Sequence, residues 1–106
     1  MILNNQEKEI AMKTIKDYEA EGVPYVINSM GEKRVTREGS IIFPNGWVAS
    51  IVRPTENPKQ YSVAICNTDG YFDWKILNTY FITDHGSVIC NTEKEVCVVL
   101  ECIKNL

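Results

Sequence analysis

The sequence predicts one α+β domain over residues 1–106, a two-layer sandwich whose N- and C-terminal helices pack on one face of a mostly antiparallel sheet. Two observations lead to this fold class. Apolar residues recur at helical spacing near each terminus, and about six short β-branched runs lie between them, in the order α-β-β-β-β-β-β-α. With 44% hydrophobic and 24% charged residues, a chain of 106 residues can bury one core without disulfides or metals.

The first expected element is a helix over residues 5–21. Asn4 or Asn5 can cap its first turn, and Gly22 follows it at a position where helices commonly end. The apolar face of this helix is expected to consist of residues spaced four and then three apart: Ala11, Ile15 and Tyr18.

Strands are expected next, over residues 23–28 and 33–38, and Gly39 is expected to break the second of them. The clearest local pattern is a hairpin over residues 41–52. Asn45-Gly46 lies between two apolar runs there, and this dipeptide accepts the positive φ angles of a tight turn.

Residues 53–59 contain two prolines and are expected to form a loop. Two further hairpins are predicted after it. The first joins residues 61–66 to residues 71–77, and the second joins residues 79–83 to residues 87–90 through the turn Asp84-His85-Gly86.

The last expected element is a helix over residues 93–104. Thr92 and Glu95 have the spacing of a capping box, and the apolar residues that follow repeat with helical period. Both terminal helices should then cover the sheet, and we expect Ile15, Trp74 and Leu100 to share one dry layer.

The net charge of −3 argues against nucleic-acid or anionic-membrane partners. The one basic cluster is Lys33, Arg34 and Arg37, which Glu32 and Glu38 flank. No signal-peptide pattern and no long apolar stretch is found, so a cytoplasmic location with reduced, buried cysteines is expected.

No nucleotide-binding motif is present, and the cysteine spacing does not match a zinc site. We therefore expect no cofactor, no metal ligands and no catalytic residues. A small enzyme that uses Cys66 or Cys90 as nucleophile with His85 as base remains an alternative, because strand pairing could bring these residues together.

Aromatic residues are concentrated between residues 71 and 81. On a strand, Phe72, Trp74 and Ile76 would share the core face, while Tyr71, Asp73 and Lys75 would share the other face. An outward face that mixes an aromatic with charged side chains is typical of a protein contact surface. The sequence therefore predicts a non-catalytic cytosolic interaction module of immunity, antitoxin-like or adaptor type, whose partner is another protein or a second copy of the chain. The predicted binding residues are Tyr71, Asp73 and Lys75.

The order of elements also resembles the frataxin arrangement. The resemblance is carried by the spacing of Asn45-Gly46, Arg53-Pro54, the run 61–65 and the run 70–74 ahead of a C-terminal helix. It would imply a metal-handling protein that uses acidic residues of its first helix, which here are Glu7, Glu9, Asp17, Glu19 and Glu21. The chain departs from that pattern in the run 23–28, which contains no acidic residue.

Overall fold

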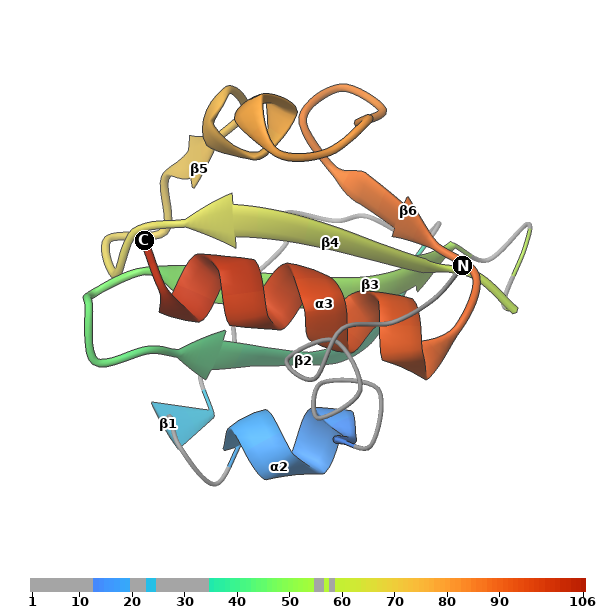
Figure 1. The fold of residues 1–106 in the computed structure, drawn as a ribbon, viewed down its shortest axis with the longest axis horizontal. Coiled ribbons are helices and arrows are strands. Elements are labelled where there is room, and N and C mark those ends of the chain that lie inside the picture. Colours follow the sequence, from blue (N-terminus) through green and yellow to red (C-terminus); the bar gives the residue numbers. More distant parts are fainter. Residues whose placement is uncertain (1–12, 20–22, 25–34, 55–56, 58) are drawn as a thin grey trace, which may run out of the picture.

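The computed structural model describes residues 13–19, 23–24, 35–54, 57 and 59–106, and it confirms the α+β fold class. An antiparallel sheet carries two helices, one short and N-terminal and the other C-terminal (Figure 1). The elements are α2 (Ile15–Glu19), β1 (Val23–Pro24), β2 (Val35–Ile42), β3 (Val48–Pro54), β4 (Tyr61–Cys66), β5 (Phe72–Asp73), the 3-10 helix η1 (Ile76–Thr79), β6 (Val88–Cys90) and α3 (Glu93–Lys104).

The sheet follows the chain in the order β1-β2-β3-β4-β5, and β6 pairs with β4 outside this path. β5 and β6 therefore share one edge of β4. Cys66 pairs with Phe72 near one end of β4, and Tyr61 pairs with Cys90 at the other end. Residues 74–87, which connect the two short strands, leave the sheet and contain η1 (Figure 1). We call these residues the 74–87 segment.

The two predicted hairpin turns that join β2 to β3 and β4 to β5 have the same design. In the first, the amide of Phe43 donates to the carbonyl of Trp47 at 2.9 Å and Gly46 has a φ of 88°. In the second, Asn67 and Tyr71 are joined in the same way at 3.0 Å. Asn45 is not in the left-handed region, so a single glycine supplies the positive φ and the turn is longer by one residue than the Asn-Gly dipeptide suggests.

The C-terminal helix is confirmed over the predicted residues, Glu93–Lys104. The Thr92 hydroxyl accepts from the amide of Glu95 at 3.2 Å, as the capping box predicts. The Glu95 carboxylate instead accepts from the amide of Asn91 at 2.9 Å. At the other end of α3, the Asn45 side chain donates to the carbonyls of Ile103 and Lys104, so the first hairpin turn caps the helix.

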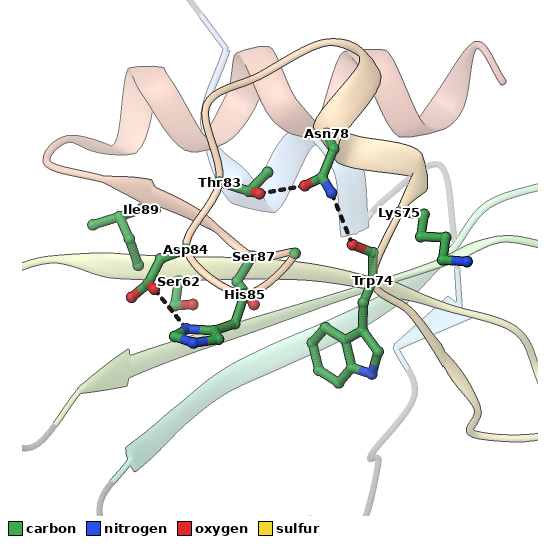
Figure 2. A pocket seen from close by; sticks show the side chains of 10 residues that line it. Ser62, Trp74, Lys75, Asn78, Thr83, Asp84, His85, Ser87 and Ile89 are labelled. Atoms are coloured by element: carbon green, nitrogen blue, oxygen red, sulfur yellow. Dashed lines mark hydrogen bonds and ion pairs between the residues drawn. The ribbon is translucent and has the colours of Figure 1, made fainter.

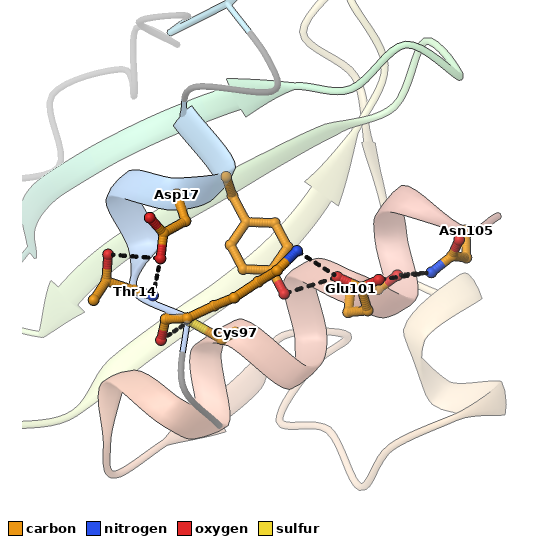
Figure 3. Close-up of polar contacts among 7 residues, drawn as sticks. Thr14, Asp17, Cys97, Glu101 and Asn105 are labelled. Atoms are coloured by element: carbon orange, nitrogen blue, oxygen red, sulfur yellow. Dashed lines mark hydrogen bonds and ion pairs between the residues drawn. The ribbon is translucent and has the colours of Figure 1, made fainter. Parts of the chain in front are cut away.

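The N-terminal helix differs from the prediction. Residues 5–12 and 20–21 lie outside the described residues, and Lys13 and Thr14 are not helical. The described helix begins after Thr14, because the Asp17 carboxylate accepts from the amide of Thr14 at 2.7 Å (Figure 3). Thr14 and Asp17 thus form a capping pair that starts a new helix inside the predicted one.

Both helices lie on the same face of the sheet, and we call it the covered face. Side chains from β2, β3, β4 and β6 meet α3 there, and Tyr18 of α2 joins them. The core consists of fully buried residues, chiefly Tyr18, Ile41, Phe43, Ile51, Val63, Ile65, Leu77, Val96, Val99, Leu100 and Ile103. On the opposite face, Val48 and Cys66 form a smaller buried cluster against Ile42 and Phe72.

The prediction that Ile15, Trp74 and Leu100 share one dry layer is wrong for Trp74. Leu100 is fully buried and Ile15 packs against the core, but the Trp74 side chain is 51% exposed. The register of β5 explains this exposure, because Phe72 pairs with Cys66 on the face away from the helices and the Trp74 ring stacks on Phe72. The predicted strand 71–77 also ends early, at Asp73. Phe72 lies in the cluster opposite the helices, and Leu77 of η1 takes the core position instead.

Two other strand predictions are wrong, and a third is tested only in part. Residues 79–83 form no strand, and β6 pairs with β4 instead of with them. Gly39 does not break β2, because the strand continues past it with a shift in register between Arg37 and Gly39. The expected strand 23–28 is described only at Val23–Pro24, and residues 25–34 lie outside the described part of the chain.

Candidate functional site

An open groove of about 830 Å³ lies between the 74–87 segment and the paired strands β4 and β6 (Figure 2). Its lining includes Ser62, Ile89, Trp74, Lys75, His85 and Ser87. Ser62 pairs with Ile89 across β4 and β6, and both alternate with buried neighbours of the covered face. The groove floor therefore belongs to the face of the sheet that points away from α3.

The 74–87 segment begins where the Asp73 side chain ends the strand. Its carboxylate accepts from the amides of Lys75 and Ile76, each at 2.9 Å. These two bonds turn the chain into η1, and they lower the pKa of Asp73, the bond from Lys75 contributing most. Asp73 thus acts as a local cap, which explains why β5 is short.

Asn78 holds the middle of this segment in place. Its amide nitrogen donates to the carbonyl of Trp74 at 3.3 Å, and its amide oxygen accepts from the hydroxyl of Thr83 (Figure 2). One side chain therefore joins the residue before η1 to the loop after it. Both polar groups of Asn78 are used within the segment, so this residue shapes the groove wall.

A tight turn at residues 84–87 closes the segment. The amide of Asp84 donates to the carbonyl of Ser87 at 2.8 Å, and the reverse bond measures 3.0 Å. The two central residues have positive φ, 51° at His85 and 88° at Gly86, as a two-residue hairpin turn with right-handed strand twist requires. The predicted Asp84-His85-Gly86 turn is confirmed, although only Asp84 and Ser87 pair across it.

Gly86 also brings this turn against the start of the segment. A Cβ atom built on Gly86 would lie 2.6 Å from the carbonyl oxygen of Trp74 and 2.7 Å from its Cα. Backbone contact this close is available only to glycine. The turn and Trp74 are thus packed backbone to backbone, which fixes the two walls of the groove relative to each other.

The Trp74 ring is oriented from its other side by Phe72. The two rings are stacked, with centroids 4.9 Å apart and planes 12° from parallel. Phe72 in turn packs on the buried pair Val48 and Cys66. Phe72 thus covers one face of the indole, while about half of the Trp74 side chain remains exposed. Trp74 therefore lines the groove with an aromatic ring whose orientation is fixed by stacking.

Asp84 and His85 form the most polar part of the lining. Nδ1 of His85 lies 2.7 Å from Oδ1 of Asp84, and the His85 side chain is 97% exposed. A carboxylate at Nδ1 favours the tautomer that leaves Nε2 unprotonated. The His85 ring can therefore accept a hydrogen bond at Nε2.

The structure does not bring the two predicted nucleophiles to His85. Cys66 lies in the small cluster opposite the helices, whereas Cys90 lies in the main core on the covered face. Neither cysteine lines the groove that contains His85. The Cys66–Cys90–His85 combination considered from the sequence is thus not assembled.

The cysteines behave as buried thiols. None of the four takes part in a disulfide, and only Cys102 is partly accessible. Burial raises the pKa of Cys90 to about 12, and nearby Glu95 adds to the effect. Burial likewise raises the pKa of Cys97 to about 11 and that of Cys102 above its ordinary value. Nucleophilic cysteines have the opposite shift, toward the thiolate.

The predicted binding residues Tyr71, Asp73 and Lys75 do not share one surface role. Tyr71 is 75% exposed and Lys75 lines the groove, while the Asp73 carboxylate is occupied by backbone amides. Sequence reasoning missed Trp74, Ile82 and the groove itself. The signal that was present is Asp73, since an aspartate whose side chain caps the following turn ends a strand and begins a new segment.

Two absences concern only the part of the chain that the structure describes. No three His, Cys, Asp or Glu side chains within it lie together in a way that could hold a metal ion. No helix in the described segments has the length and apolar composition needed to cross a bilayer. Of the acidic residues that the frataxin resemblance implied, Asp17 is described in full, and its carboxylate caps α2.

No protein-family model matches the chain, and neither a curated protein nor a solved structure matches it.

Proposed function

We propose that this chain is a non-catalytic protein-interaction module that acts in the cytoplasm, with its contact surface on residues 71–89. The observation that carries the proposal is a group of exposed apolar side chains on this stretch, which we call the exposed apolar cluster. It consists of Tyr71, Trp74, Tyr80, Ile82 and Ile89. Ile82 has 97% of its surface exposed and Tyr80 has 56%. Exposed apolar side chains mark sites of association in soluble proteins where they form a contiguous patch.

The rigidity of the surrounding backbone supports the same proposal. Three members of the cluster, Trp74, Tyr80 and Ile82, lie on the 74–87 segment, which hydrogen bonds of Asp73 and Asn78 and the close backbone contact at Gly86 hold in place. Side chains that are already held lose less conformational entropy when a partner covers them. Large aromatic anchors are also the residues that most often dominate binding energy at interfaces.

The chemistry of the groove favours binding over catalysis. Its acid–base pair, Asp84 and His85, faces solvent, and the buried thiols have pKa values raised away from reactivity. A nucleophile and a base must lie within hydrogen-bonding reach to act together. Cys66 and Cys90 are separated from His85 by the arrangement of the sheet, so the interaction module is the better-supported function.

A capture experiment with matched variants tests the proposal. The purified chain would be immobilised and exposed to cell extract, in parallel with Tyr71→Ala and Ile82→Ser variants and with Val98→Ser as control. Val98 is also an exposed apolar residue, at 42%, but it lies on α3 outside the exposed apolar cluster. We expect the two cluster variants to lose at least about tenfold in partner recovery and Val98→Ser to retain it. Equal recovery by all four proteins would contradict the proposal.

A further inference from the structure

The hairpin turn that caps the end of α3 also carries a reactive dipeptide. We propose that Asn45 is a site of spontaneous deamidation, that contact with the C-terminal end of α3 protects it, and that its conversion releases this end. Asn45 and Gly46 lie in the exposed turn between β2 and β3, where water reaches them. The inference goes beyond the proposed function and does not depend on it.

The chemistry requires an asparagine whose neighbour leaves room for attack. Asparagine is a thermally labile residue, and a following glycine has no side chain to hinder the approach of its own nitrogen. The backbone nitrogen of Gly46, after losing its proton to hydroxide, attacks Cγ of Asn45. The bond from Cγ to Nδ2 breaks, ammonia leaves, and a cyclic imide forms. Water then opens either carbonyl of the imide, which gives aspartate or isoaspartate.

Both nitrogens that this reaction uses are engaged in the folded chain. Nδ2 of Asn45, the leaving nitrogen, donates to the carbonyls of Ile103 at 2.8 Å and Lys104 at 3.1 Å. The amide of Gly46, the attacking group, donates to the carbonyl of Phe43 at 2.9 Å. These bonds must open before Cγ and the attacking nitrogen can meet, so the end of α3 protects the site.

Conversion reverses the fit between this side chain and the helix. The asparagine amide offers donors to the last carbonyls of α3, which the helical pattern leaves without partners. An aspartate has no donor, and its negative charge would lie at the end where the helix dipole is also negative. Isoaspartate in addition lengthens the backbone of the turn. The last turn of α3 thus loses its cap, and the change is permanent because the released ammonia diffuses away.

The second hairpin turn supplies a control within the same chain. Gly70 has the same φ of 88° as Gly46, and the same pattern of backbone bonds closes both turns. Asp69 stands at the place of Asn45, and within the described residues its carboxylate has no hydrogen-bond partner. Asp69→Asn therefore gives both turns the same dipeptide, of which only the first is held by a helix.

Peptide mass mapping of the full-length Asp69→Asn chain, incubated in mildly alkaline buffer, measures deamidation at both positions. In guanidinium chloride, where neither turn forms, we expect the two rates to agree within about twofold. In the folded chain, position 69 should react at least about fivefold faster than Asn45, whose amide must first leave two carbonyls. Equal rates in the folded chain would overturn the inference, as would an unreactive Asn45 in guanidinium chloride.

Two matched core substitutions separate local release of the helix end from global unfolding. Ile103 and Ile51 are both fully buried in the main core, but Ile103 lies in the last turn of α3 and Ile51 in β3. Ile103→Val should speed the deamidation of Asn45 by about threefold or more, and Ile51→Val by less than about twofold. Equal acceleration would assign the reaction to the unfolded chain and contradict protection by the helix end.

The consequence of conversion is tested with Asn45→Asp, which reproduces the aspartate product, and with Asn45→Ala, which removes the donors without adding charge. Amide hydrogen exchange in the last turn of α3 should be faster in both variants, and at least about twofold faster in Asn45→Asp than in Asn45→Ala. Exchange in β4 should stay within about twofold of the parent value. An unchanged last turn in Asn45→Asp would show that conversion does not release the helix end.

Discussion

At the scale of single residues, three glycines share one backbone angle but have different surroundings. Gly46, Gly70 and Gly86 all have a φ of 88°. A Cβ added at Gly46 or Gly70 would meet no atom within 4 Å, whereas at Gly86 it would lie 2.6–2.9 Å from atoms of Trp74. The first two positions therefore require glycine for backbone conformation alone, and Gly86 requires it for close packing as well.

This difference gives a prediction for two alanine substitutions. Gly70→Ala should lower the free energy of unfolding by about 1–2 kcal/mol, because alanine is strained at positive φ. Gly86→Ala should lower it by at least about 2 kcal/mol more, since backbone atoms of Trp74 must move apart. Urea unfolding of both variants beside the parent protein measures the two values. Equal losses would show that the contact between Gly86 and Trp74 does not form.

Single-residue features, such as turns and helix caps, could be predicted where only neighbours in the sequence determine them. The Asp84-His85-Gly86 turn and the Thr92 cap depend on neighbours in the sequence, and both are observed. The facing of Trp74 could not be predicted by strand alternation, because alternation does not say which face is covered: the register of β5 puts Phe72 opposite Cys66, away from the helices, and Trp74 stacks on Phe72. The candidate site depends on this departure, which is why Tyr71, Asp73 and Lys75 were grouped and Trp74 was left out.

At the scale of elements, the contact between α2 and α3 depends on Glu101. The buried hydroxyl of Tyr18 donates to Oε2 of Glu101 at 2.8 Å, and the ammonium of Lys13 lies 3.8 Å from the same oxygen (Figure 3). The Lys13 ammonium also lies 4.8 Å from the centroid of the Tyr18 ring. In addition, the amide of Ile15 donates to Glu93 at the start of α3 at 2.8 Å. A five-residue helix would be unstable by itself, so these contacts account for its presence.

Tyr18→Phe should therefore lower the free energy of unfolding by about 1.5–3 kcal/mol, the range for a buried hydrogen bond to a charged group. Tyr71→Phe is the matched control, since Tyr71 is 75% exposed, and its effect should lie within about 0.5 kcal/mol. A double-mutant cycle with Glu101→Gln by urea unfolding isolates the pair. If the effects of the two substitutions simply add, the hydroxyl and the carboxylate do not interact.

The ends of a helix or strand could be predicted where nearby residues set them, and could not be predicted where contacts with distant segments set them. The helix Glu93–Lys104 was predicted at its observed ends because its cap and its apolar period agree. The predicted helix 5–21 is interrupted at Lys13 and Thr14, because the start of the helix Ile15–Glu19 depends on the pair Thr14 and Asp17 and its stability on contacts with α3. β6 was paired with the wrong residues, since sequence proximity favours hairpins whereas the structure pairs it with β4.

At the scale of the whole molecule, buried thiols make the fold sensitive to alkaline pH. In the folded chain the pKa of Cys90 is raised to about 12 and that of Cys97 to about 11, mainly by burial, while an unperturbed thiol has a pKa of 9.0. Above pH 9 the unfolded chain therefore loses protons that the folded chain keeps. The stabilisation is fully present below pH 9 and is lost as the pH rises through these folded-state values.

The expected result is a decline in the free energy of unfolding between about pH 9 and 11, approaching 1.4 kcal/mol per pH unit for each thiol. Urea unfolding at a series of pH values measures the slope. Cys90→Ala should be less stable than the parent at neutral pH, because a small cavity forms, but its slope should be shallower. An unchanged slope in this variant would mean that the Cys90 thiol does not titrate differently on folding.

The sequence by itself determined the α+β class, the two hairpin turns with their glycines and the C-terminal helix, because each depends on residues within a few positions of one another. Tertiary structure alone decided which strands share the edge of β4, which face Trp74 occupies and where the groove opens. The physical reason is that these outcomes depend on contacts between segments distant in sequence, such as Gly86 against Trp74 and β6 against β4. The energies of such contacts cannot be predicted from the pattern of neighbouring residues.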